Sequence, residues 1–293
     1  MIKNCNNIIS EAIFCKEMEN LIYFFDQIIN TINFDSKNLI VLQVFIKKII
    51  SNADAANKLI FEGHIKEAKI VLRSAVESVI LITYLSQFPE KIDDYLDEAQ
   101  ILKIKNNFIV YKNMREGEPI DVNGKTITKE ELSAENKRCF NLIQDSAKNK
   151  ILKELGIKDY EIDSLNFKKV DKYFTNFRPQ FMRYEKMFKE LDEIGFQIKD
   201  EFIFSLRDIV YGFYNDSSQI AHSCFLDWSI PTYFTQKEAE YMFHFFTKVT
   251  LFLKVLLKDV VVMNNTKTQN LINEMRRAND KLEQIIYGKT LVH

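Results

Sequence analysis

Two charged residues interrupt an apolar stretch of this sequence and could form a binding site. Residues 70–85 are apolar at nearly every position, and Arg73 and Glu77 are the only charged side chains among them. Because they are four residues apart, a helix places them one turn apart on the same face, where they can pair. Burying an ion pair has a desolvation cost that a hydrophobic pair lacks. We therefore interpret the pair as a candidate catalytic site, in which Arg73 binds an anionic group and Glu77 orients Arg73.

A second polar group lies within residues 211–222. Its members are Tyr214, Asn215, Asp216, Ser218 and His222. On a helix, Ser218 and His222 are one turn apart, and the first two members fall one turn earlier on roughly the same side. A histidine among hydroxyl and amide groups can act as a general acid or base, or it can donate a structural hydrogen bond. The first alternative makes His222 catalytic and the other four residues substrate-binding.

A helical bundle is required to bring these two groups together. If the helix over residues 70–85 packs against the segment that contains His222, five or six polar groups meet inside an apolar interior. Buried polar networks of this kind are either structural locks or functional sites. The sequence leaves both alternatives open.

A third candidate site is basic and aromatic. Residues 167–189 contain seven Lys or Arg against two acids, interleaved with Phe and Tyr. Such a segment can bind single-stranded nucleic acid through phosphate contacts and base stacking. The alternative is a pair of amphipathic helices whose Phe residues face the core and whose Lys residues face water. The candidate nucleic-acid contacts are Lys168, Lys169, Lys172, Arg178 and Arg183.

The composition is that of a soluble globular protein with long helices. The chain has 293 residues, of which 46% are hydrophobic and 28% charged, with only seven Gly and four Pro for tight turns. A net charge of −1 excludes a globally basic nucleic-acid binder. Four scattered cysteines without C-x-x-C spacing, and the lack of a signal peptide or an uninterrupted membrane span, predict a cytoplasmic protein that does not enter a membrane. No metal-binding, nucleotide-binding or hydrolase motif is present, so we expect neither a metal nor another cofactor.

The periodicity of apolar residues predicts an all-α multi-helix bundle whose buried central helix covers about residues 70–85. A small β-hairpin or loop is expected near residues 117–127, where Asn123-Gly124 lies between alternating apolar residues. We predict one helical domain over residues 1–263, with an insertion at 116–128, and an amphipathic tail helix in residues 264–293. The other predicted helices cover about residues 6–32, 37–61, 90–114, 128–155, 200–216 and 235–263.

The motifs Arg73-x-x-x-Glu77 and Tyr214-x-x-x-Ser218-x-x-x-His222 resemble those of a bacterial all-helical family of unknown function, which is similar to HEPN-like helical proteins. The likeness covers mainly residues 60–110 and 205–228. HEPN proteins often act as metal-independent ribonucleases in toxin–antitoxin, CRISPR-associated and antiphage systems, usually as dimers that join two R-x-x-x-x-H motifs. In this chain Ser217 occupies the arginine position of that motif, so Arg73 would have to supply the guanidinium from another helix.

Two functional hypotheses follow. The resemblance implies a HEPN-like protein of bacterial stress or antiphage defence that binds RNA or acts on it as a ribonuclease through the polar pocket. The alternative is a non-catalytic helical binding or regulatory module, in which the polar cluster is a structural lock and the partner is RNA or another protein. Either protein could form a homodimer through the tail or the core helices.

Overall fold

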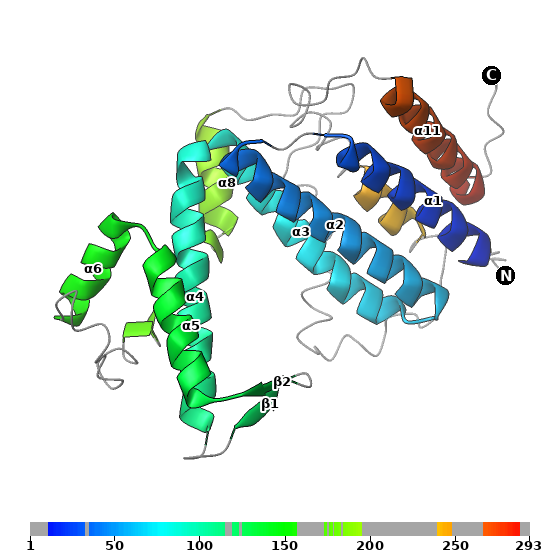
Figure 1. Ribbon diagram of the computed structural model, residues 1–293. Helices are drawn as coiled ribbons and strands as arrows, with labels where there is room; N and C mark the ends of the chain where they lie inside the picture. The colour runs from blue at the N-terminus through cyan, green and yellow to red at the C-terminus, as the bar shows by residue number, and fades with distance from the viewer. Residues whose placement is uncertain are drawn as a thin grey trace, which may run out of the picture. The chain divides into compact units, whose positions relative to one another are not determined.

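The computed structural model describes residues 11–32, 35–114, 119–122, 125–156, 173–174, 176–177, 179–182, 184–194, 239–247 and 266–287. These residues are almost entirely helical, with one short two-stranded sheet, which confirms the predicted all-α fold (Figure 1). The chain separates into two compact units. One contains residues 1–87 and 188–293, called the terminal unit below, and the other contains residues 88–187, called the inserted unit. The predicted single domain over residues 1–263 stays a prediction.

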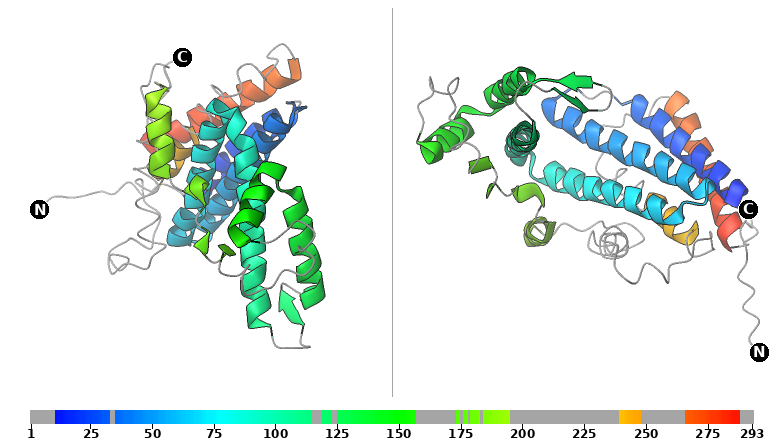
Figure 2. Two further views of the ribbon diagram at one scale, coloured as in Figure 1. Left: turned by 90° about the vertical axis from the view of Figure 1, so that its left-hand side faces the viewer. Right: turned by 90° about the horizontal axis from the view of Figure 1, so that it is seen from below.

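The terminal unit begins with three helices, α1 (Glu11–Asn30), α2 (Lys37–Phe61) and α3 (Ile65–Gln87). The hydroxyl of Ser36 caps α2 by accepting a hydrogen bond from the backbone N–H of Leu39 at 3.2 Å. Gly63 has a φ of +80° between α2 and α3, a conformation that glycine adopts without strain. This tight connection places α2 and α3 side by side as neighbours, as Figure 2 shows.

The third helix, α3, is the buried central helix that the sequence predicts. Most of its side chains are buried, and Leu72, Ile80 and Ile82 are fully so. One narrow side remains open, because Ile70 is 41% exposed and both Arg73 and Glu77 are half-buried. Most sides of the helix therefore face the core, and one narrow side faces solvent.

Two further described helices from the C-terminal part of the chain belong to the terminal unit. Helix α11 (Thr266–Tyr287) lies against α1, and Lys281 pairs with Glu17 at 3.5 Å (Figure 1). The predicted tail helix therefore packs on the body of the protein. The helix over residues 239–247 supplies buried aromatic rings, including Phe246, whose ring meets that of Phe25 edge to face.

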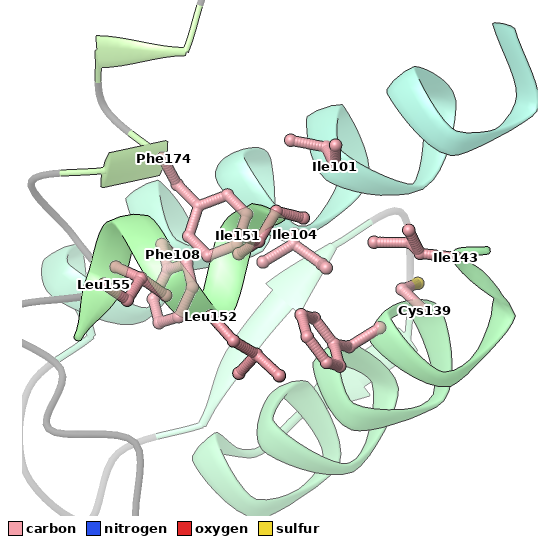
Figure 3. Close-up of a cluster of buried hydrophobic side chains, with 10 residues drawn as sticks. Ile101, Ile104, Phe108, Cys139, Ile143, Ile151, Leu152, Leu155 and Phe174 are labelled. Carbon is pink, nitrogen blue, oxygen red and sulfur yellow. The ribbon is translucent and has the colours of Figure 1, made fainter. Parts of the chain in front are cut away.

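The inserted unit is built on α4 (Ile92–Asn113), which follows a 3₁₀ turn at Pro89–Lys91. Strands β1 (Ile120–Val122) and β2 (Lys125–Ile127) form the predicted antiparallel hairpin. The hydroxyl of Thr128 and the carboxylate of Glu131 then form a capping box, which starts α5 (Lys129–Leu142). Figure 3 shows the core of this unit, where Ile104, Phe108 and Phe174 pack with side chains of α5 and of α6 (Asp145–Leu155).

The prediction of one helix over residues 128–155 is wrong. The structure has two helices there, α5 and α6 (Asp145–Leu155), separated at Ile143 and Gln144. The backbone N–H and the side-chain amide of Gln144 donate to the carboxylate of Asp97 on α4, at 3.0 and 3.1 Å. Asp97 thus replaces the helical hydrogen bond of Gln144, and this tertiary contact ends α5.

Three aromatic rings are buried in the described part of the basic aromatic segment. Phe174, Phe181 and Phe188 are buried, whereas Lys186 and Lys189 are exposed. The segment includes α8 (Tyr184–Glu193), and the carboxylate of Glu98 accepts hydrogen bonds from the backbone N–H groups of Gln180 and Phe181 just before it. For these residues the amphipathic alternative describes the structure, and the buried rings are not available for base stacking.

Candidate functional site

Arg73 and Glu77 form an ion pair on α3. The guanidinium Nε of Arg73 donates to Oε1 of Glu77 at 3.3 Å, along one face of the helix as their spacing predicts. The side chains are 22% and 28% exposed, so water and small solutes reach both of them. The pair is therefore partly desolvated without being sealed in the interior. This is the environment in which an arginine can bind an anion from solution.

Further cationic side chains lie on the same face of α3. Lys66 and Lys69 precede Arg73 by seven and four residues, which are helical repeats of about two turns and one turn. Both lysines are half-buried. The Nζ of Lys69 lies 5.4 Å from the centre of the Tyr241 ring, which comes from the helix over residues 239–247. We call Lys66, Lys69 and Arg73 the α3 cation stripe.

At the C-terminal end of α3, this face forms a hydrogen bond with another helix. Tyr84 lies three turns after Arg73 on the same side of α3, and its hydroxyl donates a hydrogen bond to the carboxylate of Glu190 on α8. Tyr84 is buried, with 5% of its surface exposed. The accessible part of the α3 face therefore runs from Lys66 to Glu77 and ends where Tyr84 enters the core.

Several predicted site residues lie outside the described part of the chain. They are Tyr214, Asn215, Asp216, Ser218 and His222 of the second polar group, and Lys168, Lys169, Lys172, Arg178 and Arg183 of the basic segment. The approach of His222 to Arg73 therefore stays a prediction. Of the predicted catalytic residues, the structure describes Arg73 and Glu77 and brings these two together.

A second cluster of titratable groups was not predicted. The hydroxyl of Tyr287 on α11 lies 2.7 Å from Nε2 of His244. Burial raises the pKa of Tyr287, and the nearby carboxylates of Glu240 and Glu283 raise it further. The sequence signal was the four-residue spacing of Glu240 and His244 on one helix and of Glu283 and Tyr287 on another.

The described residues contain no group of three or more His, Cys, Asp and Glu side chains arranged to hold a metal ion. Among them, no helix is both long enough and apolar enough to span a bilayer. The α3 face offers a fixed guanidinium charge, two ammonium groups and one carboxylate, which together suit the binding of an anion.

A family model matches residues 39–241, which is more than half of the chain. Its description is a family of unknown function, DUF5677. The matched range includes α3 and the segment that contains His222. No curated protein and no solved structure matches the chain significantly.

Proposed function

We infer an RNA-directed function for this chain, which belongs to the DUF5677 family of unknown function. In this proposal the protein is a HEPN-like helical protein of bacterial stress or antiphage defence. Arg73 binds a phosphate of the RNA, Glu77 orients Arg73, and His222 acts as a general acid or base. Tyr214, Asn215, Asp216 and Ser218 contact the substrate.

One observation carries the proposal. Arg73 and Glu77 are the only charged residues of α3 after Lys69, and their ion pair is partly open to solvent on a helix that is mostly buried. An arginine whose Nε is held by a carboxylate has a restricted orientation, so less conformational entropy is lost when it binds an anion. The anionic group of a nucleic acid is phosphate, which can accept two parallel hydrogen bonds from one guanidinium group.

The proposed cleavage uses the 2′-hydroxyl of the RNA. His222 accepts the proton of that hydroxyl while its oxygen attacks the adjacent phosphorus, and the P–O bond to the 5′-oxygen of the next nucleotide breaks. The products are a 2′,3′-cyclic phosphate and a 5′-hydroxyl end, which takes up a proton. Arg73 stabilises the additional negative charge on the phosphate oxygens during this step. Because Ser217 stands where HEPN ribonucleases have arginine, cleavage depends on Arg73 from α3.

RNA binding and cleavage are measured on the purified chain with Arg73→Gln, Glu77→Gln and His222→Ala variants. Binding to a fluorescent single-stranded RNA should weaken strongly in Arg73→Gln and less in Glu77→Gln. Arg138→Gln is the matched control, because Arg138 also pairs with a glutamate on its own helix but is exposed. Equal binding by the Arg73 variant and the original chain would refute the role of Arg73.

The cleavage assay separates the two functional hypotheses. Loss of cyclic-phosphate product in His222→Ala, with binding retained, would support the ribonuclease. Binding without any cleavage by the unmodified chain would refute the enzyme and leave the non-catalytic binding module. Sedimentation of the same samples tests the predicted homodimer.

A further inference from the structure

We propose that α6 is an exchangeable helix through which two copies of this chain form a dimer. In the dimer α5 and α6 join into one continuous helix, and the α6 of each copy packs on the inserted unit of the other. Asp97 is the residue that keeps α6 on its own unit. None of the residues assigned to RNA takes part, so the dimer is independent of the proposed function.

The joint between α5 and α6 contains no residue that forces a helix to end. Residues 129–155 include neither Gly nor Pro. Ile143 has φ −71° and ψ 143°, and Gln144 has φ −61° and ψ 148°, so only their ψ angles differ from helical values. Phe140, Ile143 and Ile151 follow the spacing of one amphipathic helix across the joint. The local sequence therefore favours a continuous helix where the structure has a break.

A tertiary contact stabilises the broken form. The carboxylate of Asp97 accepts the backbone N–H and the side-chain amide of Gln144 at 3.0 and 3.1 Å, and Asp97 is 7% exposed. Gln144 makes no side-chain capping hydrogen bond within α6. In a continuous helix the N–H of Gln144 would instead donate to the carbonyl of Phe140. Asp97 thus favours the broken form selectively, because the continuous helix does not use it.

The core that α6 covers identifies the partner as a second copy. Ile151, Leu152 and Leu155 are at most 9% exposed, and Figure 3 shows them in one cluster with Phe108 and Phe174. If α6 left this core, its apolar side chains would meet water at a considerable cost. The α6 of another copy carries the same side chains and restores the same contacts, as in other domain-swapped dimers.

The chain that follows α6 is long enough for the exchange. Residues 157–172 separate α6 and its closing glycine from the aromatic residues at 173 and 174. Sixteen residues extend to about 50 Å, whereas α6 is about 16 Å long. Phe174 can therefore stay in its own unit while α6 moves to the other copy.

The balance between monomer and dimer depends on the joint, because both forms share the core contacts. Asp97→Ala removes hydrogen bonds from the monomer alone. Hydrogen bonds to one charged acceptor change an equilibrium constant by about tenfold or more, and each dimer contains two joints. The Kd of the dimer should therefore fall about 100-fold in Asp97→Ala.

Light scattering coupled to size-exclusion chromatography measures the mass of the full chain over a range of concentrations. Asp97→Ala should double the mass at concentrations where the unmodified chain shows the lower one. Gln144→Ala keeps the backbone hydrogen bond and should give a smaller shift in the same direction, which also provides a test if Asp97→Ala does not fold. Asp94→Ala is the matched control, because Asp94 lies on the same helix but pairs with Lys91, and it should leave the mass unchanged.

A proline at the joint separates this dimer from any other association. Asp145 is the first residue of α6, a position that accepts proline, and the extended backbone of Gln144 suits the residue before a proline. The same proline inside a continuous helix would remove a hydrogen bond and clash with the preceding turn. Asp97→Ala with Asp145→Pro should therefore be monomeric, whereas Asp97→Ala with Asp145→Ala should remain dimeric. Asp145→Pro alone should melt close to the unmodified chain.

Hydrogen exchange on the two forms identifies the joined helix. The N–H groups of residues 145–147 lie in the first turn of α6 and acquire intrahelical acceptors only in the continuous helix, so their exchange should slow in the Asp97→Ala dimer. Unchanged mass in both Asp97→Ala and Gln144→Ala would overturn the proposal. A dimer that persists with Asp145→Pro, or one without slower exchange at the joint, would also overturn it and assign the association to another surface.

Discussion

Two Arg–Glu pairs in this molecule have different surroundings. On α5, Glu135 accepts hydrogen bonds from Nε and Nη2 of Arg138 at 2.7 and 2.8 Å, and it also pairs with Lys103 of α4. These hydrogen bonds, from Arg138 first and then Lys103, lower the pKa of Glu135 to about 2. On α3, Nε of Arg73 donates to Oε1 of Glu77 on the same helix at 3.3 Å.

The difference is that Glu135 joins two helices, whereas the contact of Glu77 with Arg73 lies within one. In the inserted unit, the carboxylates of Asp97, Glu98 and Glu135 each join α4 to another element, so tertiary structure explains them. The contact between Arg73 and Glu77 lies within one helix and restricts the orientation of the guanidinium, which the proposed binding of a phosphate by Arg73 would use.

The largest loss of stability is expected for Asp97→Ala. Asp97 is 7% exposed, and its removal leaves the backbone N–H of Gln144 without its acceptor between α5 and α6. The loss of hydrogen bonds to a charged acceptor costs about 1.5–3 kcal/mol of unfolding free energy. Urea denaturation measures this loss.

Asp97→Asn shows how much of the stability loss comes from the hydrogen bonds of this side chain. The asparagine keeps an acceptor for Gln144, and burial raises the pKa of Asp97, with smaller contributions from Asp93 and Asp94. Its neutral amide avoids the cost of burying a charge, so its destabilisation should be clearly smaller than that of alanine. Similar losses in the two variants would contradict the assigned role of the hydrogen bonds.

An intermediate change in the unfolding free energy is expected when the pH is lowered. The folded pKa of Glu135 lies below its unfolded value of about 4.3, so its ion pairs stabilise the protein above that pH. This stabilisation is lost as the pH falls from about 4.5 toward 2. Glu135→Gln should lower the unfolding free energy at pH 6 and flatten its decrease over this window.

Arg138→Gln provides the companion measurement. Removal of its two hydrogen bonds should raise the pKa of Glu135 and move the acid transition to higher pH. An unchanged transition would show that Lys103 alone maintains the pKa of Glu135. The raised pKa of Asp97 acts with the opposite sign, because a buried carboxylate that prefers to be protonated makes stability fall as the pH rises.

The smallest stability change is expected for Glu77→Gln. A half-exposed pair one turn apart on a helix contributes about 0.3–0.5 kcal/mol, so the unfolding free energy should change by no more than that while RNA binding weakens. Asp54→Asn, in the exposed Lys58–Asp54 pair of α2, is the matched control. A loss of several kcal/mol in Glu77→Gln alone would instead identify the pair as a structural lock.

The elements whose signals are local can be predicted from the sequence. The Ser36 cap of α2, the Asn123-Gly124 hairpin and the Thr128 capping box depend on residues within four positions of one another. The division between α5 and α6 was not predictable, because Gln144 is held by Asp97, a residue 47 positions earlier. When a helix ends because of a distant carboxylate, the spacing of apolar residues around that end does not reveal it.

The candidate site was predictable to a similar extent. The pairing of Arg73 with Glu77 follows from their spacing and is confirmed. The exposure of one side of α3 was not predicted. A helix with apolar residues on nearly every side is expected to be buried, and its sequence does not show which side is left uncovered by the neighbouring elements. The contact of Lys69 with Tyr241 joins residues 172 positions apart in the printed sequence, and only the tertiary structure brings them together.

The packing of α11 on α1 determines when the terminal unit can become complete. During synthesis α1 leaves the ribosome first, whereas its neighbour α11 is made after more than 200 further residues. The inserted unit is a run of 100 consecutive residues, so it can reach its folded state while the chain is still growing. Until translation reaches these C-terminal segments, α1 lacks its neighbour α11 and the ring of Phe25 lacks Phe246, so apolar surface of the nascent N-terminal helices stays exposed to solvent.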